Sequence, residues 1–370
     1  MRANSDRSAI RSSTPRVSRV ILVIAVVLIG AVAIITIHRF NVTRRVILIT
    51  TDLPIDDHDG LSWMIGRFSR SFPGYSVELR FAGTEQNQER RNDKTDVYVV
   101  SSGSNMQYQL TNGNVVDIPA GVVPTSGYNA GFLDAFSRSS RASNGQVSKT
   151  VFAIPIVWAP FGLFVNRSVM QENRVPIPQS WDGMIDAIHS VAGMPAPVPI
   201  AIAGSVAGRL ELVAKILSLN GGPSAHGLVE TFLREGLIHP TSERLTEEDT
   251  ALMVRDGRVA MVLGPTTLRR FIDVGSAPHI QFVPIPTYDG RPPVVAARVV
   301  AASLTRRGAA KSGPRDFIAF SARPEVQEGF VAASGSRPTY NSVHSSARNP
   351  DADGAVIARL GRIARLIIVE

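Results

Sequence analysis

The 370-residue chain contains no cysteine, which excludes disulfide bonds, zinc–thiolate sites, a cysteine nucleophile and a lipid-modified N-terminal cysteine. Aromatic residues make up only 6% of the chain, and three of them are tryptophans. The sequence also lacks a P-loop, a dinucleotide-binding glycine fingerprint, an HExxH motif and a GxSxG motif. We therefore predict no catalytic residue, no metal and no cofactor, and we do not expect an enzyme.

Positive charge is concentrated at the N-terminus rather than spread along the chain. The net charge is +8, and the first 45 residues hold eight arginines and one aspartate. The rest of the chain is therefore close to neutral. A neutral body offers no basic surface for a phosphate backbone, so we expect no nucleic-acid partner.

Residues 20–37, VILVIAVVLIGAVAIITI, form an apolar run without a charged side chain. A helix of this length reaches about 27 Å, close to the thickness of a hydrocarbon core. We predict a single-pass transmembrane signal anchor in the cell membrane over residues 20–37, with residues 1–19 as a basic cytoplasmic tail and the body outside the cytoplasm. The alternative is a signal peptide cleaved after Ala33, because Ala31 and Ala33 form an A-x-A site. The body would then be secreted or periplasmic.

The body alternates between strand and helix patterns, which predicts an α/β fold. Residues 46–51 are expected to form the first strand. Residues 61–72 are expected to form a helix, because apolar residues recur there at helical spacing and Pro73-Gly74 stops the run. The length is sufficient for two domains of ordinary size. Further strands are expected at residues 75–81, 96–100 and 198–203.

Residues 151–188 combine several of these signals. A short strand at residues 151–157 is followed by an aromatic bend at residues 158–162, and a second strand ends at Asn166. Ser180 is a good N-cap for the helix that follows, since its hydroxyl can accept a hydrogen bond from an amide of the first turn. The expected unit is a strand, a bend, a strand and a helix.

This unit resembles the hinge-proximal segment of the family 1 extracellular solute-binding proteins of ABC importers, the group that contains the maltose-binding protein. The family pattern is small-Ile-Pro, an aromatic turn, a strand ending in Asn, and a helix start of the type Pro-x-Ser/Thr-Trp-Asp/Glu. The matching residues here are Ala153, Ile154, Pro155, residues 163–166, Pro178, Ser180, Trp181 and Asp182. A second match is Asp-Gly-Arg-Val-Ala-Met at residues 256–261, followed by Gly264 and Pro265. The resemblance covers about residues 46–343.

The resemblance implies a two-lobe periplasmic-binding-protein fold of the class II type. Lobe one would comprise residues 46–150 plus about 265–310, and lobe two residues 151–264 plus about 311–370. Such a protein captures a sugar or a related small polar solute by hinge closure and delivers it to the ABC permease subunits in the membrane. An alternative is a membrane-anchored sensory or accessory ligand-binding module that signals to a membrane partner.

A hydroxyl-rich ligand is held by aromatic faces and by planar polar groups. Trp158 and Phe161 are the best ring candidates, Trp63 is a weaker one, and the resemblance places Asp52 in a loop that contacts the ligand. The other expected ligand-binding residues are Ser101, Ser102, Ser205, Thr266 and Arg298.

One candidate position departs from the sugar-binding relatives. They commonly carry a tryptophan where this chain has Thr266, so one stacking ring is missing. Arg298 stands in an otherwise apolar stretch, which is compatible with an anionic solute or with a buried structural ion pair.

Overall fold

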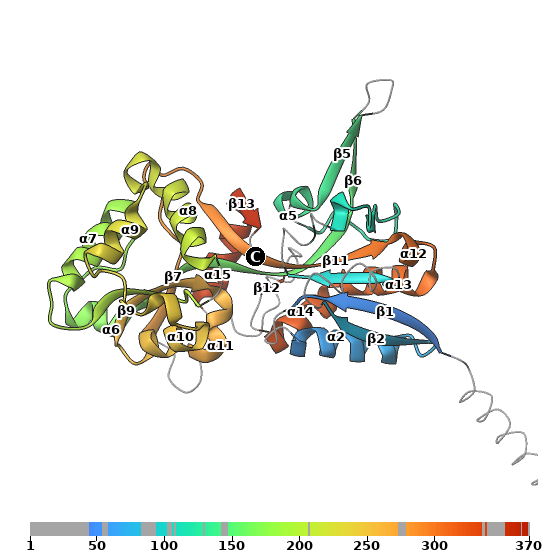
Figure 1. Cartoon of the computed structure of the whole chain (residues 1–370), viewed down its shortest axis with the longest axis horizontal. Helices are drawn as coiled ribbons and strands as arrows, with labels where there is room; N and C mark the ends of the chain where they lie inside the picture. Colours follow the sequence, from blue (N-terminus) through green and yellow to red (C-terminus); the bar gives the residue numbers. More distant parts are fainter. Residues whose placement is uncertain are drawn as a thin grey trace, which may run out of the picture. The chain divides into compact units, whose positions relative to one another are not determined.

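Two long strands, β7 (Ala153–Asn166) and β11 (Val294–Thr305), run through the body of the protein (Figure 1). They pair antiparallel, from Ala153 opposite Ser303 to Pro160 opposite Ala297. Every residue of β7 is buried. Both strands are apolar almost throughout, as is typical of strands that are covered on both faces.

The bend predicted at residues 158–162 is wrong, because β7 is one continuous strand. Instead of bending at these residues, β7 changes the strand with which it pairs. Residues up to Pro160 pair with β11, and Phe161 and the following residues pair with β9 (Val259–Pro265). Proline has no N–H to give to a ladder, and Pro160 is the last residue of β7 that pairs with β11.

The computed structural model describes residues 44–53, 58–82, 94–101, 106, 109–128, 130–141, 147–205, 208–272, 279–334, 337–338, 352–363 and 365–368. Val46–Glu370 form one compact unit. Within the described residues, no helix combines the length and the apolar character that a bilayer crossing needs. The predicted anchor, its cytoplasmic tail and the Ala33 cleavage site lie outside these residues.

The main sheet has the strand order β2-β1-β3-β11-β7-β9-β8. Its remaining members along this path are β2 (Tyr75–Phe81), β1 (Arg45–Thr51), β3 (Val97–Val100) and β8 (Val198–Ile202). The strands predicted at residues 46–51, 75–81, 96–100 and 198–203 are therefore confirmed to within a residue at each end. Shorter strands join β7 or β11: β4 (Val115–Val116), β10 (Ile280–Val283), β12 (Arg337–Pro338) and β13 (Arg365–Ile368).

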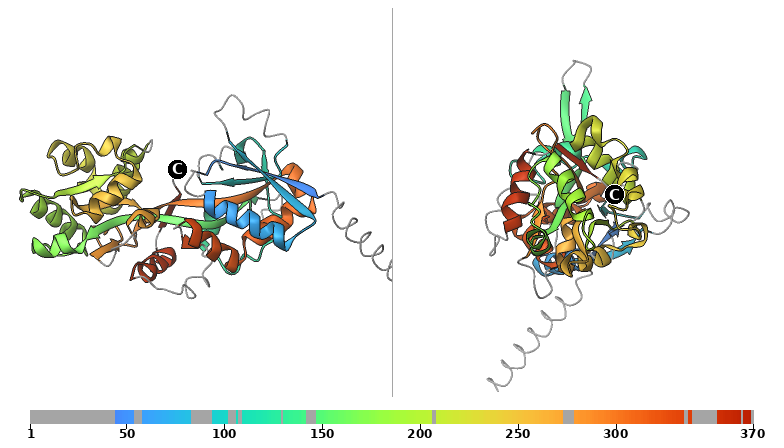
Figure 2. Two further views of the ribbon diagram at one scale, coloured as in Figure 1. Left: turned by 90° about the horizontal axis from the view of Figure 1, so that it is seen from below. Right: turned by 90° about the vertical axis from the view of Figure 1, so that its left-hand side faces the viewer.

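One group of helices packs beside β1 and β3. It includes α2 (His58–Ser71), α13 (Ser312–Ser321) and α14 (Pro324–Ser334), which lie together in Figures 1 and 2. Phe68 of α2 meets Phe317 of α13 edge to face, with 5.2 Å between ring centroids. The predicted boundary near residue 311 assigns α13 and α14 to lobe two, whereas they pack on α2. The division into lobes stays a prediction.

A second group of helices surrounds β8 and β9 (Figure 1). Ser180 caps α7 (Trp181–Ala192) as predicted, because its Oγ accepts a hydrogen bond from the Gly183 N–H at 3.1 Å. Trp181 is buried at the start of the same helix and packs so closely on Gly221 that a Cβ there would overlap its ring. The helices of this group are α6 (Arg167–Glu172), α7 (Trp181–Ala192), α8 (Arg209–Gly221), α9 (Leu228–Arg234), α10 (Glu247–Arg255) and α11 (Arg269–Ile272).

Three further helices and one hairpin complete the described elements. The helices are α5 (Ala130–Ala135), α12 (Arg306–Ala309) and α15 (Ala352–Ile363). Single 3₁₀ turns occur at Gly222–Ala225, Ser242–Arg244 and Thr266–Leu268. The hairpin of β5 (Ser137–Arg141) and β6 (Val147–Val151) forms a separate two-stranded sheet that projects away from the main sheet in Figures 1 and 2.

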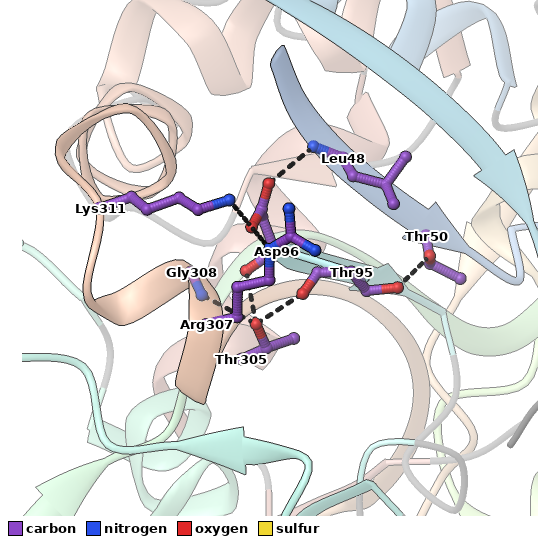
Figure 3. A network of polar contacts seen from close by, with 8 residues as sticks. All are labelled: Leu48, Thr50, Thr95, Asp96, Thr305, Arg307, Gly308 and Lys311. Atoms are coloured by element: carbon purple, nitrogen blue, oxygen red, sulfur yellow. Dashed lines mark hydrogen bonds and ion pairs between the residues drawn. The ribbon is translucent and has the colours of Figure 1, made fainter. Parts of the chain in front are cut away.

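A buried carboxylate joins β1, β3 and α12 at the amino end of β3 (Figure 3). Asp96 Oδ2 accepts a hydrogen bond from the Leu48 N–H at 3.1 Å. Its Oδ1 contacts Lys311 Nζ at 2.6 Å and Arg307 Nε at 3.2 Å. The side chain of Asp96 is only 1% exposed. The carboxylate therefore connects the N-terminal strands to residues more than 200 positions later.

The start of α12 completes this network (Figure 3). Thr305 Oγ1 donates to the Thr95 carbonyl oxygen at 2.7 Å and accepts from the Gly308 N–H at 3.0 Å, which makes Thr305 the N-cap of α12. Gly308 lies so close to Asp96 that a Cβ at this position would overlap the Asp96 carbonyl oxygen. A glycine is therefore needed where α12 meets β3.

Replacement of Gly308 by alanine is expected to lower the free energy of unfolding by about 1–3 kcal/mol, because the added methyl group collides with backbone rather than with a flexible side chain. Gly66 of α2 is the matched control, since a Cβ there meets only the end of Arg70 at 3.7 Å. Gly66→Ala should raise stability by about 0.5–1 kcal/mol. Urea denaturation of both variants measures the difference, and equal effects would contradict the close contact.

Candidate functional site

Two pairs of parallel strands, β1 with β3 and β8 with β9, direct their carboxyl ends toward the middle of β7 from two sides. β3 pairs antiparallel with β11, so that Val100 at its end lies opposite Ala301. β9 pairs antiparallel with β7, so that Pro265 at its end lies opposite Phe161. Residues 158–161 of β7, which we call the crossing segment, lie between these two strand ends. Side chains that follow β1, β3, β8 and β9 are therefore brought toward one region.

Asp52 and Ser101 follow the ends of β1 and β3, which are neighbours in parallel register. The Ser101 N–H donates a hydrogen bond to Asp52 Oδ1 at 2.8 Å. Ser101 is buried and Asp52 is half-buried. These two predicted site residues are thus brought together, with the Asp52 carboxylate fixing the end of β3. Ser102 lies outside the described residues.

The two tryptophan candidates are held by protein contacts. Trp158 is 1% exposed and meets Phe132 edge to face, with 4.9 Å between ring centroids. Its indole Nε1 is buried and has no hydrogen-bond partner within the described part of the chain. Trp63 of α2 is half-buried and covers Gly329 of α14, where a Cβ would overlap its ring.

Trp158 and Phe161 point to opposite faces of β7. They are three residues apart, and side chains alternate between the two faces of a strand. Trp158 accordingly shares a hydrophobic cluster with Phe164, whereas Phe161 shares another with Leu163 and Val165. The two rings therefore do not form the walls of a single stacking site.

Phe161 is covered by a buried arginine that the sequence analysis did not select. The guanidinium carbon of Arg209 lies 4.9 Å from the centre of the Phe161 ring. Arg209 is 5% exposed, and its Nη2 donates to Glu247 Oε1 at 2.9 Å. Its Nη1 is buried without a hydrogen-bond partner among the described residues. A buried cation therefore lies beside the crossing segment.

The pKa of Arg209 is lowered, and burial is the largest cause because it disfavours the charged form. Glu247 opposes this shift through its charge and its hydrogen bond, while the positive charge of Arg298 adds to it. Arg298 lies in β11 opposite Ala159, on the face of the sheet that Phe161 also occupies. Arg298 thus belongs to the same electrostatic group as Arg209.

The last two predicted residues follow β8 and β9. Ser205 is exposed, and its N–H donates to the Leu245 carbonyl oxygen at 3.1 Å. Thr266 directly follows Pro265, the partner of Phe161, and is 1% exposed. Its Oγ1 has no hydrogen-bond partner within the described ranges. Together with Trp158 Nε1 and Arg209 Nη1, this is the third buried polar atom at or beside the crossing segment that lacks a hydrogen-bond partner among the described residues.

Arg209 and Glu247 are the residues that sequence reasoning missed. Both stand at helix starts that the sequence marks, since Gly208 precedes α8 and Thr246 forms a capping box with Asp249 at the start of α10. A charge in the first turn of a helix usually indicates a solvated position. Here Arg209 and Glu247, which are 38 positions apart in the sequence, pair with each other, and Arg209 is buried rather than solvated.

In open α/β sheets, ligands bind at the carboxyl ends of the strands. Here two sets of carboxyl ends, from β1 and β3 and from β8 and β9, approach one pair of shared strands. Polar and charged side chains gather at these ends. The fold and the site therefore define an α/β ligand-binding protein.

The sequence model of the family described as bacterial extracellular solute-binding protein matches residues 67–355. This range is more than half of the chain, and the chain belongs to that family. The resemblance identified from residues 151–188 and 256–261 is thus confirmed. Among curated proteins, none matches the chain by sequence.

Solved structures of solute-binding proteins share the fold. A probable secreted solute-binding lipoprotein from Streptomyces coelicolor is 16% identical with a TM-score of 0.65, over 87% of this chain and 88% of that one. The putative binding protein MsmE from Bacillus subtilis, in an open conformation, is 16% identical with a TM-score of 0.68, over 89% and 88%. Maltose-bound MalE3 from T. maritima is 13% identical with a TM-score of 0.68, over 88% and 90%.

Proposed function

We propose that the chain is the extracytoplasmic solute-binding component of an ABC importer. It captures a sugar or a related small polar solute and delivers it to permease subunits in the membrane. Residues 20–37 anchor the body to the membrane in this proposal. The observation that carries the proposal is the approach of two sets of strand ends to the crossing segment, in a chain of the solute-binding family.

The ligand is bound between two lobes that move relative to each other. A solute that contacts both the β1–β3 ends and the β8–β9 ends binds the closed arrangement better than the open one, and so shifts the equilibrium toward closure. The closed form is then the one that the permease recognises. Sugars are the leading solute class, because a structural neighbour is a maltose complex.

The ligand site in this proposal takes side chains from both sides of the crossing segment. Asp52, Ser101 and Ser102 come from the β1–β3 side, with Trp63 of α2 beside them. Ser205 and Thr266 come from the β8–β9 side, and Trp158, Phe161 and Arg298 from the shared strands. Because Trp158 and Phe161 are buried on opposite faces of β7, we propose that the polar groups dominate recognition.

A panel of monosaccharides, oligosaccharides, polyols and sugar acids, tested by thermal unfolding of the full-length protein in detergent, should contain at least one stabilising solute. A solute at 100 times its Kd adds about 2.7 kcal/mol to the free energy of unfolding. Small-angle scattering should show a smaller radius of gyration with that solute, as closure requires. Failure of every class of solute to shift the unfolding temperature would contradict the proposal.

Ser205→Ala tests the β8–β9 side of the site. Ser205 is exposed, so the substitution should leave stability unchanged while it weakens solute binding by about 5- to 10-fold, the value of one hydrogen bond. Ser190→Ala at the exposed end of α7 is the control and should bind as the unmodified protein does. Isothermal titration measures both, and an unchanged affinity in Ser205→Ala would remove this residue from the site.

A further inference from the structure

The two faces of the crossing segment are enclosed differently. On the Trp158 face the helix α15 covers the indole ring, because a Cβ added to Gly361 would lie 3.4 Å from it. Asp353 fixes this helix, since it is buried and its Oδ1 accepts a hydrogen bond from a backbone N–H of β10 at 3.0 Å. The guanidinium of Arg209 lies on the opposite face, over the ring of Phe161.

One arm of the Arg209 guanidinium is held by protein and the other is not. Nη2 donates to Glu247 Oε1 at 2.9 Å. The second carboxylate oxygen, Oε2, accepts a hydrogen bond from Thr267 Oγ1 at 3.5 Å, so both oxygens of Glu247 have a partner. Arg209 Nη1 is buried and has no hydrogen-bond partner among the described residues.

Thr266 presents a second polar atom in the same condition. It is 1% exposed, and its Oγ1 has no hydrogen-bond partner in the described part of the chain. It directly follows the β9 residue that pairs with Phe161. The next residue, Thr267, bonds to the carboxylate of Glu247, as Arg209 does. The two unpaired atoms therefore belong to one set of contacting residues beside the crossing segment.

Unpaired polar atoms of this kind are unfavourable inside a protein. A buried N–H or hydroxyl without a partner loses its hydrogen bond to water and gains none in return. In a solute-binding protein, a bound solute supplies the partners that such atoms lack. Ser205 and Gly208 are exposed, so the chain reaches the surface immediately before Arg209.

We infer that Arg209 is a solute-binding residue that determines specificity: its Nη1 donates a hydrogen bond to one hydroxyl oxygen of a sugar, and Thr266 Oγ1 bonds to another hydroxyl. Glu247 is a positioning residue, because it holds the guanidinium through Nη2. A hydroxyl suits both groups, since it can accept from the arginine and can either donate to or accept from the threonine. This inference rests on the proposed function and narrows its solute class to sugars with free hydroxyl groups.

Deoxy sugars test the inference with the full-length protein in detergent. Glucose, galactose and maltose are titrated by calorimetry, and each sugar that binds is compared with its monodeoxy forms, in which one hydroxyl is replaced by hydrogen. We expect one form to bind about 10- to 100-fold more weakly, because it leaves the Arg209 N–H without an acceptor. A second form should bind about 5- to 10-fold more weakly, because it loses the bond to Thr266 Oγ1.

Arg209→Lys keeps a positive charge beside Glu247 but has no Nη1, so it should weaken binding of the parent sugar by about 10-fold or more. The deoxy form that the unmodified protein binds poorly should bind to this variant as well as the parent sugar does, because the bond is already absent. Arg234→Lys makes the same substitution at the exposed end of α9 and should bind as the unmodified protein does. Circular dichroism without sugar confirms that each variant is folded.

Thr266→Val is an independent variant that removes the hydroxyl and keeps the branched shape. Because this hydroxyl has no partner among the described residues, its removal should not destabilise the fold. The variant should bind the parent sugar about 5- to 10-fold more weakly and should no longer respond to the second deoxy form. If Arg209→Lys does not fold, the deoxy forms with the unmodified protein and with Thr266→Val decide the inference.

A deoxy penalty that disappears in Arg209→Lys supports the inference. The inference is overturned if folded Arg209→Lys binds as the unmodified protein does, or if every monodeoxy form binds as tightly as its parent sugar. Binding of another solute but of none of the three sugars overturns it as well. In each of these cases the proposal of a solute-binding component stands. If no solute of any class binds, that proposal fails together with the inference.

Discussion

Asp96→Asn is expected to lower the free energy of unfolding by about 3 kcal/mol, which is near the lower end for removal of one partner from a buried ion pair. Among the described residues, each of the three groups that contact this carboxylate is a donor: the Leu48 N–H, Lys311 Nζ and Arg307 Nε. An asparagine must turn its NH₂ group toward at least one of them. The side chains of Lys311 and Arg307 are 38% and 48% exposed, so water solvates them in the variant and limits the loss.

Glu78→Gln is the matched control for Asp96→Asn. Glu78 pairs with Arg80 at 2.8 Å, but both side chains are substantially exposed, so the pair contributes less than about 1 kcal/mol. Chemical denaturation of the two variants compares the same substitution chemistry at a buried and an exposed site. Similar losses in both would show that the Asp96 network does not hold β1, β3 and α12 together.

Trp158→Ala is expected to lower the free energy of unfolding by about 3–5 kcal/mol, because it empties a fully buried volume between Phe132 and Gly361 of α15. Trp158→Phe keeps a ring and removes an Nε1–H without a partner among the described residues, so it should change stability by less than about 1.5 kcal/mol. Thermal and denaturant unfolding measure both variants.

These two variants also decide how Trp158 should be used in binding experiments. If Trp158→Ala destabilises the fold and Trp158→Phe does not, loss of solute binding in Trp158→Ala does not identify Trp158 as a stacking residue. Trp158→Phe is the better probe, since an unchanged affinity in this folded variant would remove the indole from the ligand site. A destabilisation of Trp158→Ala below about 1 kcal/mol would contradict the buried position of the ring.

Local signals in the sequence were sufficient for much of the fold. The helical spacing before Pro73-Gly74 corresponds to α2, and the Ser180 cap is present as expected. The continuous course of β7 was not predictable, because Pro160 and Gly162 are residue types that usually interrupt a strand. Pairing with β11 and then β9 keeps these residues extended, and tertiary contacts of this kind leave no local pattern.

The candidate site was predictable only in part. Residues at strand ends, such as Asp52 and Ser101, follow directly from the strand pattern, and their contact is observed. The face on which a side chain lies depends on the exact register, which is why Trp158 and Phe161 were grouped although they diverge. Arg209 was missed because its burial depends on Glu247, Phe161 and the packing of two helices.

The pairing of β3 with β11 has a consequence for biosynthesis. Thr305 Oγ1 donates a hydrogen bond to the Thr95 carbonyl oxygen, 210 positions earlier. The core beside β1 is not complete until α13 and α14 have been added. A ribosome must therefore add nearly the whole chain before the N-terminal strands can bury their apolar faces. Contacts of such long range also slow folding. The nascent chain therefore stays incompletely folded through most of translation. An incompletely folded chain is the state that can pass through a narrow translocation channel.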